Sequence, residues 1–344
     1  MRPCPAADVP LSSFTSLQTG GPATWLVEVQ SLAELPHWRS WAHKRELPLT
    51  IIGGGTNILV ADEGVPGLVL RMANRGITST HDTDQTVLVR CAAGELFDDV
   101  VAQTVACEWW GLENLSHIPG TVGATPIQNV GAYGVEVSEL VESVEVFAVD
   151  TGETRILSRS ECRFGYRDSY FKTAAGKGYI ITAVTFRLHK QPRPRLQYMD
   201  LATRFATSAQ QTLTPADIRA EVCQIRAGKF PDWHTLGTAG SFFKNPIVPT
   251  EVAQSLREQH PELPVYELGQ GKSKLALGWI LDKLCGLRGY REGAVGLYQQ
   301  QALVLVQYGG ATSAAIDAFA TMVEERVYTN TGICIEREVT QLPK

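Results

Sequence analysis

The stretch Leu47–Val60 reads LPLTIIGGGTNILV and places three consecutive glycines between two apolar runs. Each run has the composition of a buried strand, so the stretch predicts a strand, a tight turn and a second strand. Glycines in such a turn can present backbone N–H groups to a pyrophosphate without interference from Cβ atoms. The spacing is neither GxGxxG nor a P-loop, and an ordinary glycine turn accounts for this segment equally well.

A second glycine-rich segment, Ile118–Gly134, reads IPGTVGATPIQNVGAYG. Small residues dominate it, and Tyr133 is its only large side chain after Gln128. Such a segment cannot build a core by itself, but its backbone can approach a large flat ligand closely. Two such loops in a strand-rich region favour a dinucleotide that carries a planar ring.

Around these loops the first half of the chain predicts mainly strands. They are expected at Gly67–Arg71, Thr86–Cys91, Val141–Val149 and Tyr179–Leu188, with a hairpin turn at Asp150-Thr151-Gly152. One amphipathic helix is expected over Glu95–Cys107, where Phe97, Val100, Val101 and Thr104 recur at helical spacing. The basic, proline-interrupted segment Lys190–Arg195 (KQPRPR) predicts a linker or an exposed loop.

The second half mixes helices and strands. Thr214-Pro215 predicts a helix start, with Thr214 as N-cap, that leads to Lys229. Helical stripes are expected at Leu277–Leu284 (closed by Gly286) and at Ile316–Val327, and strands at Gln301–Gln307 and Ile333–Val339. The alternation of helices and strands predicts an α+β protein.

Length and composition restrict the class of protein. The chain has 344 residues, 44% hydrophobic and 19% charged, enough to bury the cores of two or three domains. Its net charge of −5 offers no general basic field to nucleic acid or an anionic membrane. The seven cysteines and seven histidines show no metal-binding spacing, and the chain contains no long apolar run. We therefore expect a reduced, cytoplasmic protein without a metal, a nucleic-acid partner or a membrane span.

Four motifs carry a resemblance to a known family. They are GLENLSHIPGTVGATPIQNVGAYGVE (111–136), ECRFGYRDSYFK (161–172), AGSFFKNP (239–246) and EREV (336–339). In this order they resemble the UDP-N-acetylenolpyruvoylglucosamine reductases, flavoenzymes of peptidoglycan precursor synthesis. The resemblance extends from about Thr15 to Val339, nearly the whole chain.

The resemblance implies a fold and a cofactor. The family binds FAD non-covalently on a domain of the vanillyl-alcohol-oxidase (PCMH) type made of two α+β subdomains, which an α+β substrate-binding domain follows. Here these regions are expected at 1–75, 76–205 and 206–331, and the segment 332–344 can fold back onto the first. Many members carry Ser where this chain has Ala124. The positions that match FAD contacts are Gly53, Gly54, Gly55, Thr56, Asn57, Ile118, Pro119, Gly120, Gly123, Ala124, Ile127, Gly131 and Ile181.

The resemblance also implies a reaction in two halves. NADPH, the co-substrate, reduces the flavin; the enolpyruvyl UDP-sugar then accepts a hydride and a proton and becomes UDP-N-acetylmuramate. Arg167 and Glu338 match the pair that stabilises the developing negative charge, and Ser241 matches the proton donor. Without the resemblance, Arg167 reads as an ion-pair partner of Asp168, Ser241 as a loop residue and Glu338 as a solvated strand position.

Further positions match contacts to the substrate. Tyr198 corresponds to a mobile tyrosine loop found in one subgroup of the family, and Arg288 stands where relatives often carry Lys. On local pattern alone, Lys229 is an ordinary cation at a helix C-terminus and Tyr198 a partly exposed aromatic residue. The full set is Tyr166, Tyr198, Lys229, Asn245, Arg288 and Gln301.

The resemblance therefore implies a monomeric FAD enzyme whose partners are a small UDP-sugar and NADPH. Two alternatives remain open. One is an oxidase of sugars or aldonolactones on the same kind of FAD domain, reoxidised by oxygen. The other is a catalytically silent nucleotide-binding protein that has kept the fold.

Overall fold

The chain folds into two compact units, and each draws on segments far apart in the sequence. The structure, a computed structural model, describes residues 4–206 and 212–343. The first unit combines the segment that ends at Val9 with Ala23–Gly55 and Pro66–Arg226. The second combines Pro10–Pro22, Thr56–Val65 and the segment that starts at Ala227. The boundaries expected at residues 75 and 205 stay predictions about how the chain divides.

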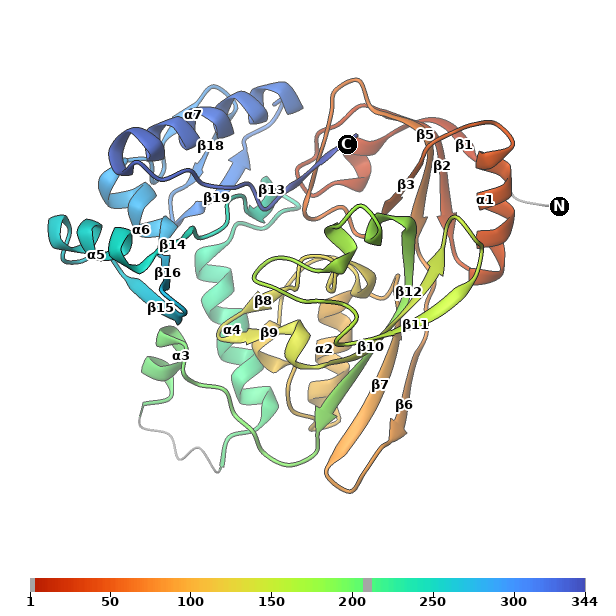
Figure 1. Cartoon of the computed structure of the whole chain (residues 1–344), viewed down its shortest axis with the longest axis horizontal. Helices are drawn as coiled ribbons and strands as arrows, with labels where there is room; N and C mark the ends of the chain where they lie inside the picture. Colours follow the sequence, from red (N-terminus) through yellow and green to blue (C-terminus); the bar gives the residue numbers. More distant parts are fainter. Residues whose placement is uncertain (1–3, 207–211, 344) are drawn as a thin grey trace. The chain divides into compact units, whose positions relative to one another are not determined.

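The first unit contains a four-stranded sheet in the order β1-β2-β5-β3 (Figure 1). Helix α1 (Leu35–His43) buries Leu35 and Trp38 in the same hydrophobic core as Leu68 and Leu70 of β5. Strands β3 and β5 run parallel, and β3 ends directly before the three-glycine loop. The strands are β1 (Ala6–Pro10), β2 (Pro22–Val29), β3 (Leu49–Ile52) and β5 (Val65–Met72).

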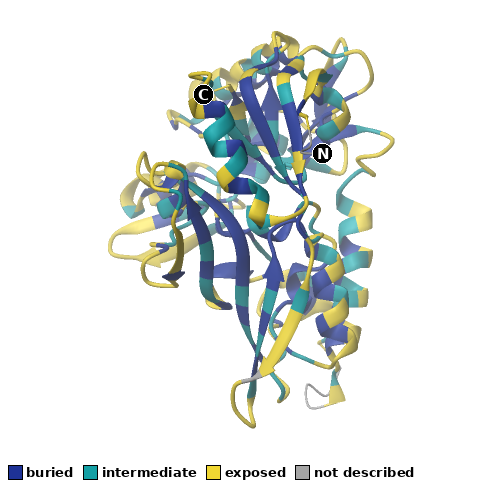
Figure 2. Ribbon diagram, turned by 90° about the vertical axis from the view of Figure 1, so that its right-hand side faces the viewer, coloured by how far each residue is buried: buried dark blue, intermediate teal, exposed yellow. Residues whose placement is uncertain are grey.

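A five-stranded antiparallel sheet, in the order β11-β10-β12-β7-β6, forms the rest of this unit. The inner strands β7, β10 and β12 are buried or half-buried along their length, whereas the edge strand β11 and residues 82–85 between β6 and β7 are mostly exposed (Figure 2). The hairpin turn predicted at Asp150-Thr151-Gly152 joins β10 to β11 and is confirmed. The strands are β6 (Ile77–His81), β7 (Thr86–Ala92), β10 (Val141–Ala148), β11 (Thr154–Ser158) and β12 (Tyr179–His189).

Two predicted helices lie in this part of the chain. Helix α2 (Phe97–Ala106) buries the apolar positions that predicted it, including Phe97 and Thr104. Helix α4 (Pro215–Lys229) begins where expected, because Thr214 Oγ1 accepts the N–H of Asp217 and the Asp217 carboxylate accepts the N–H of Thr214. With α3 (Met199–Arg204), α4 encloses a small apolar core that includes Trp110 and Tyr133.

The second unit is built on a four-stranded sheet in the order β13-β19-β18-β17. Helix α7 (Ser313–Thr331) packs on this unit's core through the predicted stripe from Ile316 to Val327. The stripe Leu277–Leu284 is helical, but after α6 (Leu277–Trp279) it continues as a π-helix over Ile280–Leu284. The strands are β13 (Gly237–Ser241), β17 (Arg291–Glu292), β18 (Val295–Tyr298) and β19 (Gln301–Gln307).

Smaller elements complete both units. A three-stranded sheet in the order β14-β16-β15 packs with α5 (Thr250–Gln259) in the second unit. The short hairpin β8-β9 begins in the second glycine-rich segment of the first unit and ends just after it. The strands are β8 (Gly131–Ala132), β9 (Val135–Glu136), β14 (Ile247–Pro249), β15 (Val265–Gly269) and β16 (Lys272–Leu275).

The last strand differs from the prediction. Instead of a strand over Ile333–Val339, the structure has β20 (Thr340–Leu342), which pairs in parallel with β4 (Ile58–Val60). The residues before it form a single bridge, Phe243 with Arg337. Apart from that bridge, residues 333–339 form no strand, so the prediction is wrong there.

Within the described residues, no helix combines the length and the apolar character that a membrane span requires. The same residues contain no group of His, Cys, Asp and Glu side chains arranged to hold a metal ion.

Candidate active site

The two glycine-rich loops contact each other in the first unit. A Cβ atom added to Gly54 would lie 2.9 Å from Cα of Gly120, and one added to Gly53 would lie 2.4 Å from Oγ1 of Thr121. Both positions therefore require glycine for close packing rather than for an unusual backbone angle. The structure brings together the two segments that the sequence analysis assigned to one cofactor.

A buried hydroxyl lies at this junction. Thr121 is 6% exposed, and its Oγ1 has no hydrogen-bond partner among the described residues. A buried polar atom without a partner is costly, and a ligand oxygen would satisfy it. The narrow glycine cradle and this hydroxyl therefore fit a bound phosphate-containing cofactor such as FAD.

Position 124 shows what the departure from the family pattern changes. The Cβ of Ala124 would lie 3.7 Å from a Cβ on Gly53, so its methyl group is directed toward the first loop. A serine at this position would direct a hydroxyl there instead.

The other positions assigned to FAD fall in both units. Ile181 is buried on β12, whereas Ile127 is 39% exposed and its carbonyl accepts the Ser169 hydroxyl. The first unit holds Gly53, Gly54, Gly55, Ile118, Pro119, Gly120, Gly123, Ala124, Ile127, Gly131 and Ile181, and the second holds Thr56 and Asn57.

Arg167 is fixed by the backbone of the second glycine-rich segment. Its guanidinium donates hydrogen bonds to the carbonyls of Gly131 (2.7 Å) and Asn129 (3.3 Å), and it lies 5.6 Å from the Tyr166 ring. Arg167 has a φ of 50°, which is uncommon for a residue other than glycine, and Lys172 donates to its carbonyl (2.7 Å). The two carbonyl groups fix the orientation of the guanidinium.

Tyr198 packs against the end of the same segment. Its ring meets that of Tyr133 edge to face, with centroids 5.3 Å apart. The Tyr133 hydroxyl is hydrogen-bonded to the Arg226 guanidinium, which also donates from Nε to the carbonyl of His117 (3.1 Å). Burial raises the pKa of Tyr133 to about 12 and lowers the pKa of Arg226.

Neither Tyr133 nor Arg226 is among the site residues predicted from the sequence. Two signals could have identified them. Tyr133 is the one large residue after Gln128 in a segment of mostly small residues, and Arg226 precedes Lys229 by about one helical turn on α4. Tyr133 contacts both Arg226 and Tyr198, the residue expected to close over the substrate.

Ser241 stands at an irregularity of the second unit's sheet. It ends β13 opposite Val304, and the β13-β19 ladder shifts register between Thr238 and Ser241. Gly240 accommodates this shift with a φ of 74°. A bulge of this kind redirects a side chain at the end of a strand.

Glu338 lies beside Ser241 because the EREV segment pairs with the AGSFFKNP segment. The N–H of Glu338 donates to the carbonyl of Phe242 (2.8 Å), the residue that follows Ser241. Asn57 joins them, since its Nδ2 donates to the Glu338 carbonyl (3.3 Å) and its carbonyl accepts the N–H of Thr340 (3.0 Å). Three positions named from separate parts of the sequence thus converge in one unit.

Arg337 determines which way Glu338 faces. Its guanidinium binds α7 through Glu324 (2.7 and 3.1 Å), Thr321 (2.9 Å) and Asp317. Successive side chains of an extended segment point to opposite sides. With Arg337 bound to α7, Glu338 is therefore directed away from that helix.

Two positions expected to bind substrate meet the start of α6. Asn245 Oδ1 accepts the N–H of Leu277 (2.9 Å), and Gln301 Oε1 would lie 3.2 Å from a Cβ on Gly278. Arg288 is held elsewhere, by the Gln299 carbonyl (2.7 Å) and the Asp282 carboxylate (3.3 Å). Lys229 is the last residue of α4.

Two known protein families match this chain, one mainly in each unit. Residues 23–158 match the FAD binding domain family, and residues 232–342 match the family described as UDP-N-acetylenolpyruvoylglucosamine reductase, C-terminal domain. A protein named UDP-N-acetylenolpyruvoylglucosamine reductase from Chromobacterium violaceum is 43% identical over 333 residues, 96% of this chain and 97% of that protein. This chain belongs to the UDP-N-acetylenolpyruvoylglucosamine reductase family.

Other members of the family support the same assignment. A protein of that name from Pseudomonas aeruginosa is 42% identical over 316 residues, 92% of each chain. The crystal structure of UDP-N-acetylenolpyruvylglucosamine reductase from Thermus caldophilus matches with a TM-score of 0.68 and 26% identity, covering 100% of both chains. These matches confirm the expected fold class, an α+β chain that carries an FAD-binding domain.

Proposed function

We propose that this chain reduces UDP-N-acetyl-3-O-(1-carboxyvinyl)-glucosamine to UDP-N-acetylmuramate, using FAD and NADPH, in peptidoglycan precursor synthesis. One observation supports this reaction more than any other: Glu338 is hydrogen-bonded to the residue next to Ser241, although the two motifs are distant in the sequence. The curated relatives that match most of the chain bear the name of this reductase. We extend the proposal to a monomeric, cytoplasmic enzyme.

The cofactor is assigned to the first unit's glycine cradle. FAD, when bound, supplies the chemistry that carries a hydride from NADPH to the substrate. The backbone at Gly53–Gly55 and at Gly120 approaches it closely, and Thr121 Oγ1 donates a hydrogen bond to it. Thr121 was not among the residues assigned from the sequence, and its buried hydroxyl is the reason to add it.

Three side chains are assigned to the reaction itself. Arg167, oriented by two carbonyl groups, binds the substrate carboxylate and stabilises the negative charge that develops there. Glu338 acts on the same charge as a hydrogen-bond donor in its protonated form. Ser241 Oγ donates a proton to the carbon next to the one that accepts the hydride, and it regains a proton from solvent.

The nucleotide part of the substrate requires cations and aromatic surface. We assign its diphosphate to Lys229 and Asn245, with Gln301 and Arg288 as further contacts. Tyr198, together with Tyr166, covers the substrate, and Tyr133 supports Tyr198 from below through their edge-to-face contact. NADPH precedes the sugar nucleotide as the co-substrate.

Anaerobic stopped-flow absorbance of the flavin tests the proposal. The purified protein is expected to carry FAD, to be bleached by NADPH, and to be reoxidised by the enolpyruvyl substrate. Ser241→Ala is expected to keep the bleaching step and to lose about 10²-fold or more in reoxidation. Ser255→Ala, an exposed serine of α5, is the matched control.

Three outcomes would count against the proposal. A protein that cannot be reconstituted with FAD would refute it. Equal loss in both half-reactions of Ser241→Ala would remove that residue from the role of proton donor. Rapid formation of hydrogen peroxide with a free sugar would favour the alternative of an oxidase.

A further inference from the structure

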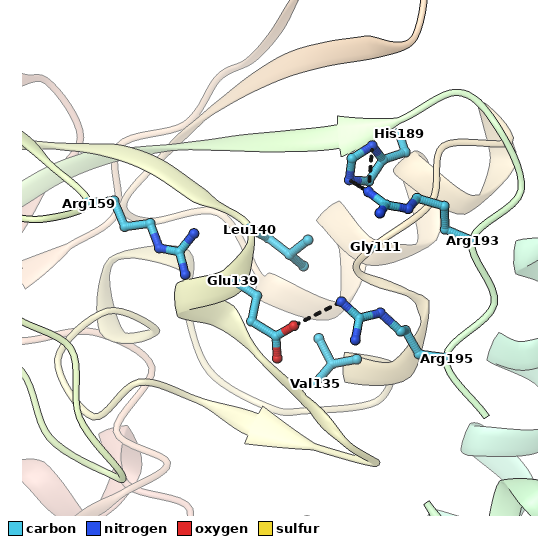
Figure 3. Close-up of a pocket in the computed structure, with 8 residues that line it drawn as sticks. All are labelled: Gly111, Val135, Glu139, Leu140, Arg159, His189, Arg193 and Arg195. Carbon is cyan, nitrogen blue, oxygen red and sulfur yellow. Dashed lines mark hydrogen bonds and ion pairs between the residues drawn. The ribbon is translucent and has the colours of Figure 1, made fainter. Parts of the chain in front are cut away.

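The basic segment Lys190–Arg195 walls a cavity that the proposed reaction does not use. The cavity, about 270 Å³ in volume, lies entirely in the first unit. Figure 3 shows Arg193 and Arg195 at one side of it, Arg159 at the other, and Leu140 between them. None of the residues assigned to FAD, substrate or catalysis lines it.

The charges around the cavity do not balance. Glu139 is the one acid among the lining residues, and it is already engaged. Its Oε2 accepts a hydrogen bond from Arg195 (3.1 Å), and its Oε1 accepts the N–H of Glu136 (3.1 Å). Within residues 4–206 and 212–343, the Arg159 side chain forms no hydrogen bond or ion pair.

Arg193 also lacks an acidic partner. It donates to the ring of His189 (2.9 Å to Nε2). Burial, together with the neighbouring Arg193, Arg195 and Arg187, lowers the pKa of His189, so the ring is neutral near pH 7. A neutral ring orients the guanidinium without cancelling its charge. Two guanidinium charges, those of Arg159 and Arg193, therefore face the cavity uncompensated.

The backbone that carries two of these arginines is stiff. Pro192 and Pro194 alternate with Arg193 and Arg195 and restrict φ in a segment without regular secondary structure. Asn114 Nδ2 donates to the Arg195 carbonyl (2.8 Å), and the Lys190 N–H donates to the Gln85 carbonyl (2.9 Å). Anchors at both ends reduce the conformational entropy that the segment would lose on binding a ligand.

We propose that this cavity is a second ligand site, which binds a small phosphate-bearing anion through Arg159 and Arg193. The planar guanidinium matches pairs of phosphate oxygens and binds them strongly. The cavity is smaller than the pockets of about 300–1,000 Å³ that hold drug-sized ligands, so it accepts one or two phosphate groups rather than a whole dinucleotide. In a chain of net charge −5, three arginines around one cavity form a local positive field.

Calorimetric titration of the FAD-loaded protein with inorganic pyrophosphate tests this site. Arg159→Ala and Arg193→Ala are each expected to weaken binding about tenfold or more. Both side chains are exposed, so the variants are expected to fold, which their thermal unfolding checks. Arg257→Ala, an exposed arginine of α5 outside the cavity, is the matched control and is expected to bind like the wild type.

Two further arms identify the ligand and separate this site from the proposed substrate site. Lys229→Ala is expected to bind pyrophosphate as tightly as the wild type, whereas Arg193→Ala is expected to bind it more weakly. Titration with ADP tests whether the cavity binds a nucleoside diphosphate through its phosphate groups. ADP binding that is as tight as pyrophosphate binding or tighter, and that Arg193→Ala weakens, supports the site. Pyrophosphate binding that is absent, or that Arg159→Ala and Arg193→Ala leave unchanged, would overturn it. These measurements need no turnover, so failure of the proposed reductase reaction would not affect them.

Discussion

The guanidinium of Arg167 donates a hydrogen bond of 2.7 Å to the carbonyl of Gly131, in the segment that we assign to the cofactor. A Cβ atom on Gly131 would lie 3.1 Å from Nη1 of the same guanidinium. Arg167 and the backbone at Gly131 therefore pack directly against each other, so a shift of this segment would move the guanidinium. This relationship makes Arg167 a sensitive probe of the proposed chemistry.

Arg167→Lys is expected to separate charge from geometry. Lysine keeps the positive charge but loses the planar fork that both carbonyls orient. We expect FAD to be retained, bleaching by NADPH to be nearly unchanged, and reoxidation by the enolpyruvyl substrate to slow by about 10²-fold. Stopped-flow absorbance measures both steps. A variant as fast as the wild type in reoxidation would show that fork geometry is unimportant.

Gly54→Ala tests the contact between the two loops. The added Cβ would lie 2.9 Å from the Gly120 backbone, which has no flexible side chain to move aside. We expect FAD affinity to fall and stability to decrease by about 1–3 kcal/mol. Gly178→Ala is the control, because nothing lies within 4 Å of a Cβ there. Flavin content and thermal unfolding measure both effects, and similar behaviour of the two variants would argue against the contact.

Glu113 is expected to make stability fall as pH rises. Its side chain is fully buried, and burial raises its pKa to about 7 from the ordinary value of 4.5, although the N–H of Gly111 and the charge of Arg195 oppose this. The folded state therefore binds the proton more tightly than the unfolded state does. The contribution of Glu113 to stability is therefore complete below about pH 4.5 and is lost as the pH rises through 7, by about 3 kcal/mol in all.

Glu113→Gln is expected to remove this pH dependence. The amide oxygen still accepts the Gly111 N–H, and no charge has to be buried. We expect the variant to unfold at a higher temperature than the wild type at about pH 8, with little difference at about pH 5. Glu258→Gln, an exposed position of α5, is the control. Parallel pH profiles of Glu113→Gln and the wild type would contradict the assignment.

Two ion pairs of the EREV region are expected to differ in strength. Arg337 is about a quarter exposed and binds three residues of α7, whereas Lys244 pairs with Glu336, whose side chain is 76% exposed. Arg337→Ala is expected to cost about 1–3 kcal/mol, and Lys244→Ala less than about 1 kcal/mol. Chemical denaturation measures both. Equal costs would mean that Arg337 does not anchor the segment that carries Glu338.

Local features were predictable from the sequence because short-range physics determines them. The cap at Thr214, the stripe of α2 and the turn at Gly152 depend only on neighbouring residues, and all are present. The strand expected at Ile333–Val339 was placed wrongly, because side-chain alternation does not reveal which backbone groups are available for pairing.

The sites were predictable only in part. The motif resemblance identified Asn57, Ser241 and Glu338 as site residues. It could not show that they lie together, because hydrogen bonds between segments up to 281 residues apart bring those segments into contact. The sequence predicted that KQPRPR forms a basic loop. It did not predict that Arg193 and Arg195 of this loop line one cavity together with Arg159, which follows β11. Tyr133 and Arg226 were missed because no motif marks them and only the fold brings Tyr133 into contact with Arg226 and Tyr198.

The pairing of β4 with β20 has a consequence for the order of assembly during translation. The second unit takes Ile58–Val60 from early in the chain and Thr340–Leu342 from its last residues. A chain still being synthesised therefore holds every segment of the first unit once Arg226 has emerged, and that unit can fold while the second waits. Glu338 and β20 leave the ribosome almost together, so the β4-β20 ladder and the residue that we propose for catalysis become available at the same stage of synthesis.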